Sequence, residues 1–545
     1  MKRNLIFGII LTGLIIGFNL KPAYCDDPPQ FEWAHTYLSQ TGHFSTPYKI
    51  STDTFGTIIS GNFSGVLDFN PGDVVDNRTS FGSYGDGFVT KTNPDGSYAW
   101  TQQIGAANEN NYVSMHTVDH DGNIYVGVES SGNITLEIIK KFSPNGTLLW
   151  TVNAALPVIS VAVNDNDHTI VVASGAYVSG RIEKRDMTNG AIIWEKTLDN
   201  IEPLTILIDH LNNIYYAGRF TGTADFNPNG GGDPRTTHQG LDAFVTKLNS
   251  DGSYGWTRTF DVDTDGKSMI AIDEENYIYS LVSLQPTSYR PIINKLSPLD
   301  GSSLWTDTFT SSIDVGTMGM GPASSGNLII AGGFSNSVDF DPTSGTDTRI
   351  STGGYDGFVT KLNRNNGSYV GTFTFTGTAG SFINDIAIDS QENMFVAGGY
   401  YGSGYMDMDP GDGSVNSQLN SSSGSIFVIK LRRANHAPVT TAPATIDGYV
   451  GTRLKFYVSV TDQDPGDTVQ VSFSNVPSWG GVSTSYNGTN YSYSFFGTPT
   501  QAGVFQVTVN ATDGHDTVHQ NVLLNIRAAL IQPRLLLTAQ AVPVN

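Results

Sequence analysis

The sequence predicts an all-β protein built from a repeated unit, and three observations carry this prediction. The chain contains 60 Gly residues and many Asn, Asp, Ser and Thr residues, which favour short strands and tight turns over helices. Apolar and polar residues alternate over short runs, as they do in half-buried strands. The hairpin pattern DGFVTKTNPDGSYAW (86–100) recurs as DAFVTKLNSDGSYGW (242–256) and DGFVTKLNRNNGSYVG (356–371). Because 545 residues are too many for one core, we expect several domains or a repeat array.

Weaker copies of this hairpin are IIKKFSPNGTLLW (138–150), IEKRDMTNGAIIW (182–194) and INKLSPLDGSSLW (293–305). The tryptophans that end the hairpins, at positions 100, 150, 194, 256 and 305, are 50, 44, 62 and 49 residues apart. This spacing is typical of propeller blades and not of helical repeats. A second repeated pattern, a turn followed by an alternating strand, precedes each hairpin, as in DGNIYVG (121–127), NNIYYAG (212–218) and ENMFVAG (392–398). Each unit is therefore predicted to form four strands, and seven units can be counted.

The seventh unit ends after FVIKL (427–431) without a final strand. A candidate for that strand, FEWAHTYL (31–38), lies at the other end of the chain and contains Trp33. If this segment pairs as the outer strand of the last unit, the ring closes and two exposed sheet edges disappear. We therefore predict a seven-bladed β-propeller closed by an N-terminal strand. The alternative is an open row of hairpins or two separate β domains.

Several units resemble a known family on four matched segments. SGNFSGVLDFNPG (60–72), AGRFTGTADFNP (217–228) and AGGFSNSVDFDP (331–342) are each followed by DGFVTK or DAFVTK, and AGGYYGSGYMDMDPG (397–411) is followed by SIFVIK. These units are similar to the bacterial β-propeller repeat of exported multidomain proteins. Units two, three and five lack the DFxP loop and resemble blades of quinoprotein-type propellers. The resemblance covers residues 31–433 and implies the fold, whereas it says little about activity.

A second domain is predicted over residues 436–527, where about seven strands are expected. The segment GTPTQAGVFQVTVNATDG (497–514) resembles the cadherin-like, immunoglobulin-type sandwiches that are appended to secreted and adhesive proteins. The tail, residues 528–545, is too short and too interrupted to cross a membrane, and is either a docking strand or a disordered end.

The N-terminus, residues 1–25, has the pattern of a secretory signal peptide: Lys2 and Arg3, an apolar run from Leu5 to Leu20, then small and polar residues. A membrane anchor is the alternative, although the run is shorter than the roughly 20 residues that span a bilayer. Lipidation of Cys25 is a second alternative. Bulky Tyr24 argues against it, because it stands where lipoprotein signals usually have a small residue. Cys25 is the only cysteine of the chain, so no disulfide is expected after cleavage. The protein is predicted to be secreted or held at the cell surface.

The formal net charge of -22, without a basic cluster, makes nucleic acid and anionic membranes improbable partners. An extracellular protein or a glycan is the expected partner. The mature chain is predicted to have no membrane span.

The DFxP loops carry the first candidate metal ligands. Asp407, Asp409 and Asp412 lie in the turn-prone segment DMDPGDG (407–413), and Ca²⁺ prefers six to eight oxygen ligands. Loops of units six, seven and one are expected to form one acidic arc, because the ring makes these units neighbours. The alternative is structural: each Asp caps its own turn while the following Phe packs under the blade.

The C-terminal domain supplies the second candidate site. Its resemblance to cadherin-type domains implies that Asp462, Asp464 and Asp513, with Asn435, surround Ca²⁺ at a domain junction. The sequence lacks the linker carboxylates and the following repeat of that family, so a single weakly bound ion or none is expected.

The function predicted is that of an exported, non-enzymatic binding, adhesion or scaffold protein. The alternative is an extracellular carbohydrate-active lyase or hydrolase with a site at the propeller channel, because the fold permits both. Asp119, Asp209, Asp273 and Asp389 end inner strands, where capping of a turn is the expected role. Tryptophan and tyrosine at the GSYAW strands are expected to pack between blades and not to bind carbohydrate. No catalytic residues are predicted.

Overall fold

The computed structural model describes residues 29–529, except for residues 40–42, 73, 82–84, 107–108, 133–136, 177–178, 228–230, 262–267, 285–289, 310–315, 412, 420–423, 463–467, 487–490 and 515. The predicted signal peptide and nearly all of the tail lie outside the described residues. The chain divides into two units, Met1–Arg433 and Ala434–Asn545. Every element of the described residues is a strand, as the sequence predicts. The described residues contain no helix that could span a membrane.

In its described part, the first unit contains seven four-stranded antiparallel sheets, numbered here in chain order and given from the first strand outward. Sheet 1 consists of β2 (Ser45–Asp53), β3 (Gly56–Phe63), β6 (Asp86–Thr92) and β7 (Tyr98–Ile104). Sheet 2 consists of β8 (Glu109–Val118), β9 (Ile124–Gly132), β10 (Glu137–Phe142) and β11 (Leu148–Ala154). Sheet 3 consists of β12 (Val158–Asn164), β13 (Thr169–Ala176), β14 (Ser179–Asp186) and β15 (Ile192–Asp199).

Sheet 4 consists of β16 (Ile201–Ile208), β17 (Ile214–Asp225), β18 (Pro234–Leu248) and β19 (Tyr254–Phe260). Sheet 5 consists of β20 (Ser268–Ile272), β21 (Ile278–Leu284), β22 (Arg290–Leu296) and β23 (Ser303–Thr308). Sheet 6 consists of β24 (Gly316–Pro322), β25 (Asn327–Phe334), β28 (Asp356–Asn363) and β29 (Tyr369–Phe375). Sheet 7 consists of β30 (Gly380–Ile388), β31 (Met394–Tyr401), β34 (Ser425–Arg432) and β1 (Gln30–Tyr37).

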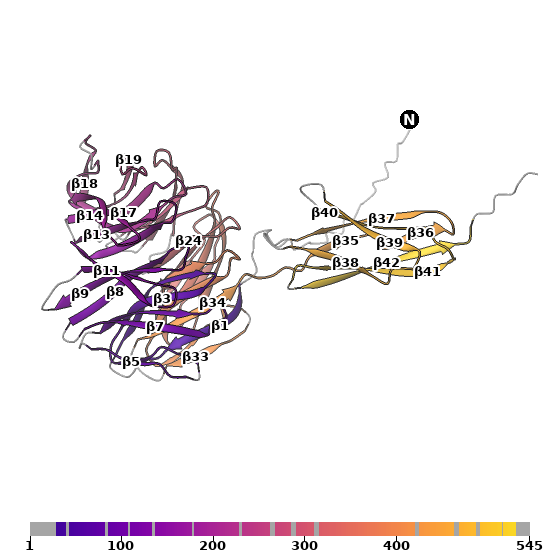
Figure 1. Ribbon diagram of the computed structural model, residues 1–545, viewed down its shortest axis with the longest axis horizontal. Helices are drawn as coiled ribbons and strands as arrows, with labels where there is room; N and C mark the ends of the chain where they lie inside the picture. Colours follow the sequence, from indigo (N-terminus) through magenta and orange to yellow (C-terminus); the bar gives the residue numbers. More distant parts are fainter. Residues whose placement is uncertain are drawn as a thin grey trace, which may run out of the picture. The chain divides into compact units, whose positions relative to one another are not determined.

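Sheet 7 joins the two ends of the first unit. Its outer strand β1 pairs antiparallel with β34, and Trp33 lies opposite Lys430. In Figure 1 the labels of β1 and β34 lie next to each other, although β1 is indigo and β34 is orange, because the two strands are far apart in the sequence. The pairing expected for FEWAHTYL is therefore present.

The first strands of the seven sheets contact one another in a cycle. β2 contacts β8, and the contacts continue through β12, β16, β20, β24 and β30, which contacts β2 again. The core lies between the sheets and not within one layer, since each large cluster of buried residues joins two neighbouring sheets, as Val171 and Phe244 do for sheets 3 and 4. Middle strands are covered on both faces, and all eight residues of β3 are buried. This is the organisation of a β-propeller.

Local sequence sets the turns of this unit. In the hairpin between β6 and β7, the Asn93 N–H donates to the Ser97 carbonyl and the Gly96 N–H donates to the Asn93 carbonyl. Gly96 has φ of 83°, a left-handed conformation that glycine adopts without strain. The chain can therefore reverse within a few residues, as the repeated D-G-S pattern predicts.

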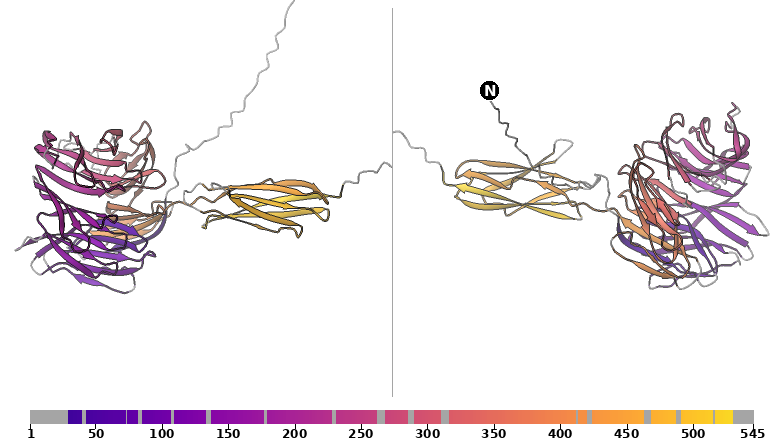
Figure 2. Two further views of the ribbon diagram at one scale, coloured as in Figure 1. Left: turned by 45° about the horizontal axis from the view of Figure 1, so that its top comes forward. Right: turned by 180° about the vertical axis from the view of Figure 1, so that it is seen from behind.

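In its described residues, the second unit forms two four-stranded sheets. One contains β35 (Val439–Thr441), β37 (Leu454–Thr461), β40 (Tyr491–Gly497) and β39 (Gly480–Tyr486). The other contains β36 (Thr445–Tyr449), β42 (Thr517–Arg527), β41 (Gly503–Thr512) and β38 (Gln470–Ser474), and β36 runs parallel to β42. Figure 2 shows these strands in two layers. Phe456 stacks on Phe495, and Trp479 meets Phe495 edge-on, so aromatic rings join the Val, Leu and Ile side chains in the core of this unit.

Candidate binding surface

Sheets 1, 4, 6 and 7 carry an insert between their second and third strands, and the DFxP motifs lie in these inserts. In three of them a two-stranded ribbon forms: β4 (Val66–Asp68) with β5 (Asn77–Thr79), β26 (Ser337–Asp339) with β27 (Thr348–Ile350), and β32 (Gly404–Asp407) with β33 (Asn416–Leu419). In sheet 4, β17 and β18 continue as the ribbon themselves. The four inserts are thus variants of one structure.

The first aspartate of each motif holds the ribbon turn. Asp68 Oδ1 accepts hydrogen bonds from the backbone N–H groups of Asn70 at 3.0 Å and Asp76 at 2.9 Å. The same two bonds, from the residues two and eight positions later, are made by Asp225, Asp339 and Asp407. These bonds satisfy backbone N–H groups that have no other backbone partner in the turn. The turn-capping interpretation therefore describes these four carboxylates.

The residue after this aspartate fastens the ribbon to its sheet. Phe69, Phe226, Phe340 and Met408 are at most 2% exposed. Phe69 lies 5.1 Å from Phe63 and 5.0 Å from Phe88, ring centre to ring centre. Burial of one large side chain contributes about 1.5 to 3 kcal/mol, so the ribbon is anchored by packing.

A clasp of three residues, which we call the Arg-Asp-Tyr clasp, ties three of the ribbons to the outer strand of the same sheet. Arg235 and the Tyr254 hydroxyl both bond the carboxylate of Asp233. Asp76 is held in the same way by Arg78 and Tyr98, and Asp347 by Arg349 and Tyr369. Burial, together with the bond to Asp233, raises the pKa of Tyr254 to about 12. In sheet 7 the corresponding ribbon positions are Val415 and Ser417, so this clasp is absent there.

The clasps were not predicted from the sequence, although a signal for them is present there. The segments DNRT, DPRT and DTRI each place an arginine two residues after the aspartate, and each is followed by a GSY segment. Only the sheets with both elements form the clasp.

The predicted metal ligands of the seventh insert are partly described. Asp409 Oδ1 accepts the Gly411 N–H at 2.9 Å, and Asp407 caps the turn as above. Asp412 lies outside the described residues. Among the residues that the structure describes, no group of three or more His, Cys, Asp or Glu side chains is placed so that it could hold a metal ion.

In the second unit, two of the residues implied by the cadherin resemblance come together. Asn435 Nδ2 donates to Asp513 Oδ2 at 3.0 Å and to Asp516 Oδ2 at 2.8 Å. Asp462 directly follows β37, and Asp464 lies outside the described residues. Asp516 was not among the residues named from the sequence.

The aspartates at the ends of inner strands cap turns, as expected. Asp119 and Asp209 each accept the backbone N–H of the asparagine four residues later at 2.7 Å. Asp273 and Asp389 accept the corresponding N–H at 2.8 Å. Tyrosine hydroxyls add a second bond to Asp119, Asp209 and Asp273.

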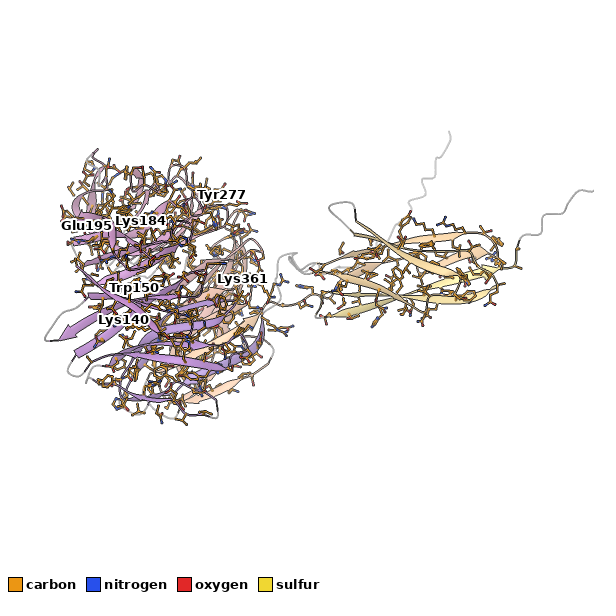
Figure 3. All side chains as sticks on the ribbon, viewed as in Figure 1. Lys140, Trp150, Lys184, Glu195, Tyr277 and Lys361 are labelled. Atoms are coloured by element: carbon orange, nitrogen blue, oxygen red, sulfur yellow. The ribbon has the colours of Figure 1, made fainter. Side chains whose placement is uncertain are left out.

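A second repeated device, which we call the clamp, joins neighbouring sheets. Trp256 Nε1 and Lys247 Nζ of sheet 4 both donate to the Pro298 carbonyl in the hairpin of sheet 5, at 3.2 and 2.9 Å. The same pair of bonds links sheet 1 to 2, sheet 2 to 3 and sheet 5 to 6, with the carbonyls of Pro144, Met187 and Arg364 as acceptors. Figure 3 labels Trp150 of this set, together with Lys184 and Lys361, the lysines at the matching positions of sheets 3 and 6. The tryptophans therefore pack between sheets, as predicted, whereas the role of the FVTK lysines was missed.

The tryptophans of sheets 3 and 7 lie against a glycine of the next hairpin. A Cβ at Gly252 would lie 3.2 Å from Trp194, and a Cβ at Gly96 would lie 3.0 Å from Trp33. His35 adds a 2.7 Å hydrogen bond to the Gly96 carbonyl. Strand β1 thus contacts sheet 1 as the other outer strands contact their neighbours.

A polar network departs from the repeat at sheets 7, 1 and 2. Lys49 pairs with the buried Asp385 at 3.0 Å, and Asp385 also accepts the Ile50 N–H at 2.9 Å. His116 bonds Ser51 Oγ through Nε2 and Ser60 Oγ through Nδ1, both at 2.7 Å. The positions that match His116 in the register of the other sheets are all apolar: Ile50, Val161, Ile206, Ile270, Met320 and Ile386. Burial lowers the pKa of His116 to about 3, and nearby Lys49 adds to the effect.

Comparison with known proteins gives similarity to solved structures only. No family model matches the chain, and no curated protein matches it. The structure of the Dos1 propeller is 11% identical and has a TM-score of 0.40, covering 75% of this chain and 96% of its own. The structure of U3-55K is 9% identical with a TM-score of 0.42, covering 74% of this chain and 99% of its own. A chimeric titin Z1Z2 structure is 17% identical with a TM-score of 0.14, covering 17% of this chain and 98% of its own. Similarities of this size carry no information on what the chain binds.

Proposed function

We propose that the chain is an exported, non-enzymatic binding or scaffold protein of the cell surface or the extracellular space. Its seven sheets would be the blades of a closed propeller, and its second unit an immunoglobulin-like or cadherin-like sandwich. The partner is an extracellular protein or a glycan.

The observation that carries this proposal is the contrast between a constant frame and variable connections. The clamp residues recur at the same register positions from sheet to sheet, whereas the connection between second and third strands is an insert in only four of them. A rigid frame that presents different loops is how binding proteins separate stability from recognition. The pairing of β1 with β34, and the contact of Trp33 with Gly96, support a closed ring.

Calcium is the cofactor that the acidic residues suggest. We propose Asp462, Asp464 and Asp513 as ligands in the second unit, with Asp407, Asp409 and Asp412 as a weaker candidate in the first. The closeness of Asp513 and Asp516, which both accept from the Asn435 amide N–H group, supports the former, because Ca²⁺ binds several carboxylate oxygens at once.

The binding of calcium is tested by thermal unfolding. Added Ca²⁺ should raise the melting temperature through ligand linkage, and Asp513→Asn should abolish the rise while Asp407→Asn leaves most of it. A melting curve that neither millimolar Ca²⁺ nor a chelator moves would remove calcium from the proposal.

Binding itself is tested with the mature chain on immobilised extracellular polysaccharides and on cell-surface protein extracts. We expect retention on a specific member of one group, and no change in the length of any polysaccharide. Release of new chain ends would establish the alternative class, an extracellular lyase or hydrolase.

A further inference from the structure

Exposed aromatic side chains are distributed unevenly over the first unit. Its described residues include six aromatic side chains in the exposed class: Phe44, Tyr48, Phe55, Phe81, Tyr401 and Tyr405. All six belong to sheets 1 and 7 or to their connections, and the described parts of sheets 2 to 6 expose none. Because the sheets share one architecture, this asymmetry does not come from the fold. Clustered exposed rings are typical of a binding surface.

Four of these residues, Phe44, Tyr48, Phe81 and Tyr401, lie at one end of the two sheets, and we call them the aromatic rim. Phe44 directly precedes β2, Phe81 leads into β6, and Tyr401 ends β31. Antiparallel pairing places the start of β2, the end of β3 and the start of β6 at the same end of sheet 1. Residue Phe81 is fixed there by its N–H, which donates to the buried Asp86 at 2.9 Å.

Backbone contacts join the two halves of the rim across the boundary between sheets 7 and 1. The Ser45 N–H donates to the Gly424 carbonyl at 3.3 Å. Gly424 precedes Ser425, which pairs with Tyr400, so Phe44 and Tyr401 are each adjacent in sequence to a residue of this link. The Phe44 side chain lies over Gly85, where a Cβ would be 3.6 Å from its Cζ.

Tyr48 is held in place by the polar network described above. It is the extra residue of a β-bulge in β2, between Pro47 and Lys49, and is 43% exposed. On its C-terminal side, Lys49 and the Ile50 N–H are both bound to Asp385, and Ser51 is bound to His116. The buried network thus fixes β2 to the sheets on either side. A preorganised ring loses little entropy on binding, which gives Asp385 and His116 a positioning role.

The segments that form the rim are rich in aromatic rings and hydroxyl groups. The described rim segments, residues 43–48 (HFSTPY), 79–81 (TSF) and 400–405 (YYGSGY), contain no Asp, Glu, Lys or Arg. Lys49 and Asp385 pair with each other, whereas Asp86, which is bonded to the Phe81 N–H, and Glu129, which lies near Tyr48, add negative charge next to the rim. In a chain of net charge -22, such a surface suits an uncharged ligand, while acidic polymers are repelled by the rest of the molecule. Sugars present C–H faces that stack on aromatic rings and hydroxyls that bond serine and tyrosine.

We propose that the aromatic rim binds an uncharged polysaccharide, stacking sugar rings on Phe44, Tyr48, Phe81 and Tyr401. This inference rests on the proposed binding function and names its ligand class and its place. It assigns the rim, and not the aspartate turns of the inserts, as the recognition surface of the propeller.

Affinity electrophoresis of the mature full-length chain tests the inference, with a soluble glucan, mannan and xylan as neutral probes and polygalacturonate as the acidic one. We expect at least one neutral probe to retard the chain and polygalacturonate to leave it unretarded. Tyr48→Ala and Phe81→Ala should each weaken binding about three- to tenfold, as the loss of one stacked ring implies. Phe55→Ala is the matched control, because Phe55 is equally exposed in sheet 1 but lies in the turn between β2 and β3, at the other end.

The proposed role of Asp385 in positioning Tyr48 is tested separately, by binding together with circular dichroism. Asp385→Asn should weaken the same neutral probe, while the far-ultraviolet circular dichroism stays that of the wild type. If the circular dichroism changes, Ser51→Ala provides the milder test of the same role.

The outcomes separate this inference from the proposed function. Binding to a neutral probe that the rim substitutions leave unchanged would overturn the rim while the binding function stands. Retention by a protein or by the acidic polymer alone would overturn the ligand class. Absence of binding to every carbohydrate and protein tested would overturn both.

Discussion

Six of the seven seams between neighbouring sheets place a tryptophan of one sheet near the hairpin of the next, whereas the seam between sheets 6 and 7 does not. Gly371 of sheet 6 pairs with Lys361, as Trp100 pairs with Lys91 and Trp33 with Lys430. A Cβ at Gly371 would meet nothing within 4 Å. Sheet 7 has no hairpin between its third and fourth strands, since β34 and β1 come from opposite ends of the unit. The tryptophan is thus missing where its acceptor hairpin is missing.

This difference explains an irregularity of the sequence. The sixth hairpin reads GSYVG where the strongest copies read GSYAW and GSYGW. A tryptophan there would gain no packing partner and would leave a large apolar ring against water. Trp33 stands near the N-terminus, far from the other tryptophans in sequence. It is found there because β1 completes the last sheet and places this ring against Gly96. The presence of tryptophan at this position therefore depends on the hairpin turn of the next sheet and not on the strand that carries the tryptophan.

The largest expected effect comes from removing a clamp. Trp256 is 8% exposed and donates its indole N–H to Pro298. Trp256→Ala should lower the free energy of unfolding by about 3 to 5 kcal/mol, since it leaves a cavity and removes one of the two hydrogen bonds to the Pro298 carbonyl. Chemical denaturation followed by circular dichroism measures the change. A loss below about 1 kcal/mol would show that the clamp does not stabilise the seams.

The Arg-Asp-Tyr clasps are expected to contribute less. Asp233→Asn weakens the bonds from Arg235 and Tyr254, and should cost about 1 to 2 kcal/mol because both partners are half-exposed. Sheet 7, which has Val415 in place of the aspartate, shows that a ribbon forms without the clasp. The ribbon of sheet 4 should therefore loosen without unfolding, and limited proteolysis within the insert should accelerate.

The clasps also predict a dependence of stability on alkaline pH. The pKa of Tyr254 is raised from 10.0 to about 12, so the folded state keeps its proton more tightly than the unfolded state. Stability is fully present below pH 10.0 and is lost as the pH rises toward about 12. Combined Tyr98→Phe, Tyr254→Phe and Tyr369→Phe should flatten this loss, and Tyr457→Phe, at an exposed position of the second unit, is the control. An unchanged alkaline profile in the triple variant would contradict the clasp as the cause.

The sequence predicted the parts of the fold that depend on neighbours along the chain. The turn caps of Asp68 and Asp407, and the hairpin turns, follow from spacings of a few residues. The clasps could not be derived in this way, because Asp76 and Tyr98 are 22 residues apart and meet only after the ribbon folds onto its own sheet. The exposure of Phe44 could not be predicted either, since residue type does not decide it: Phe69 is also a phenylalanine and is buried. Asn435 and Asp513 were named together only as calcium ligands implied by family resemblance, and the hydrogen bond between them was not predicted.

The carboxylate of Asp307, at the seam between sheets 5 and 6, is expected to destabilise the folded chain at neutral pH. Asp307 follows the clamp residue Trp305 by two positions, and the hairpin residue Gly367 approaches its Oδ2. Burial raises the pKa of Asp307 from 3.8 to about 6. Since the folded state binds the proton more tightly, stability decreases as the pH rises from 3.8 to about 6. Asp307→Asn should therefore stabilise the chain by about 1 kcal/mol at neutral pH, after discounting for partial exposure, and by less in acid. Equal stabilisation at both pH values would contradict this cause.

The smallest change in stability is expected at the seam between sheets 6 and 7, which has no tryptophan at this position. Gly371→Trp places the missing ring in β29, where a Cβ meets nothing within 4 Å and where tryptophan favours a strand more than glycine does. With no hairpin to receive it, the ring should change the free energy of unfolding by no more than about 0.5 kcal/mol. The same denaturation experiment measures it, and Trp256→Gly is the reciprocal control, with a large loss expected. If Gly371→Trp stabilised the chain as strongly as Trp256→Gly destabilises it, the hairpin of the next sheet would not be what gives these tryptophans their effect.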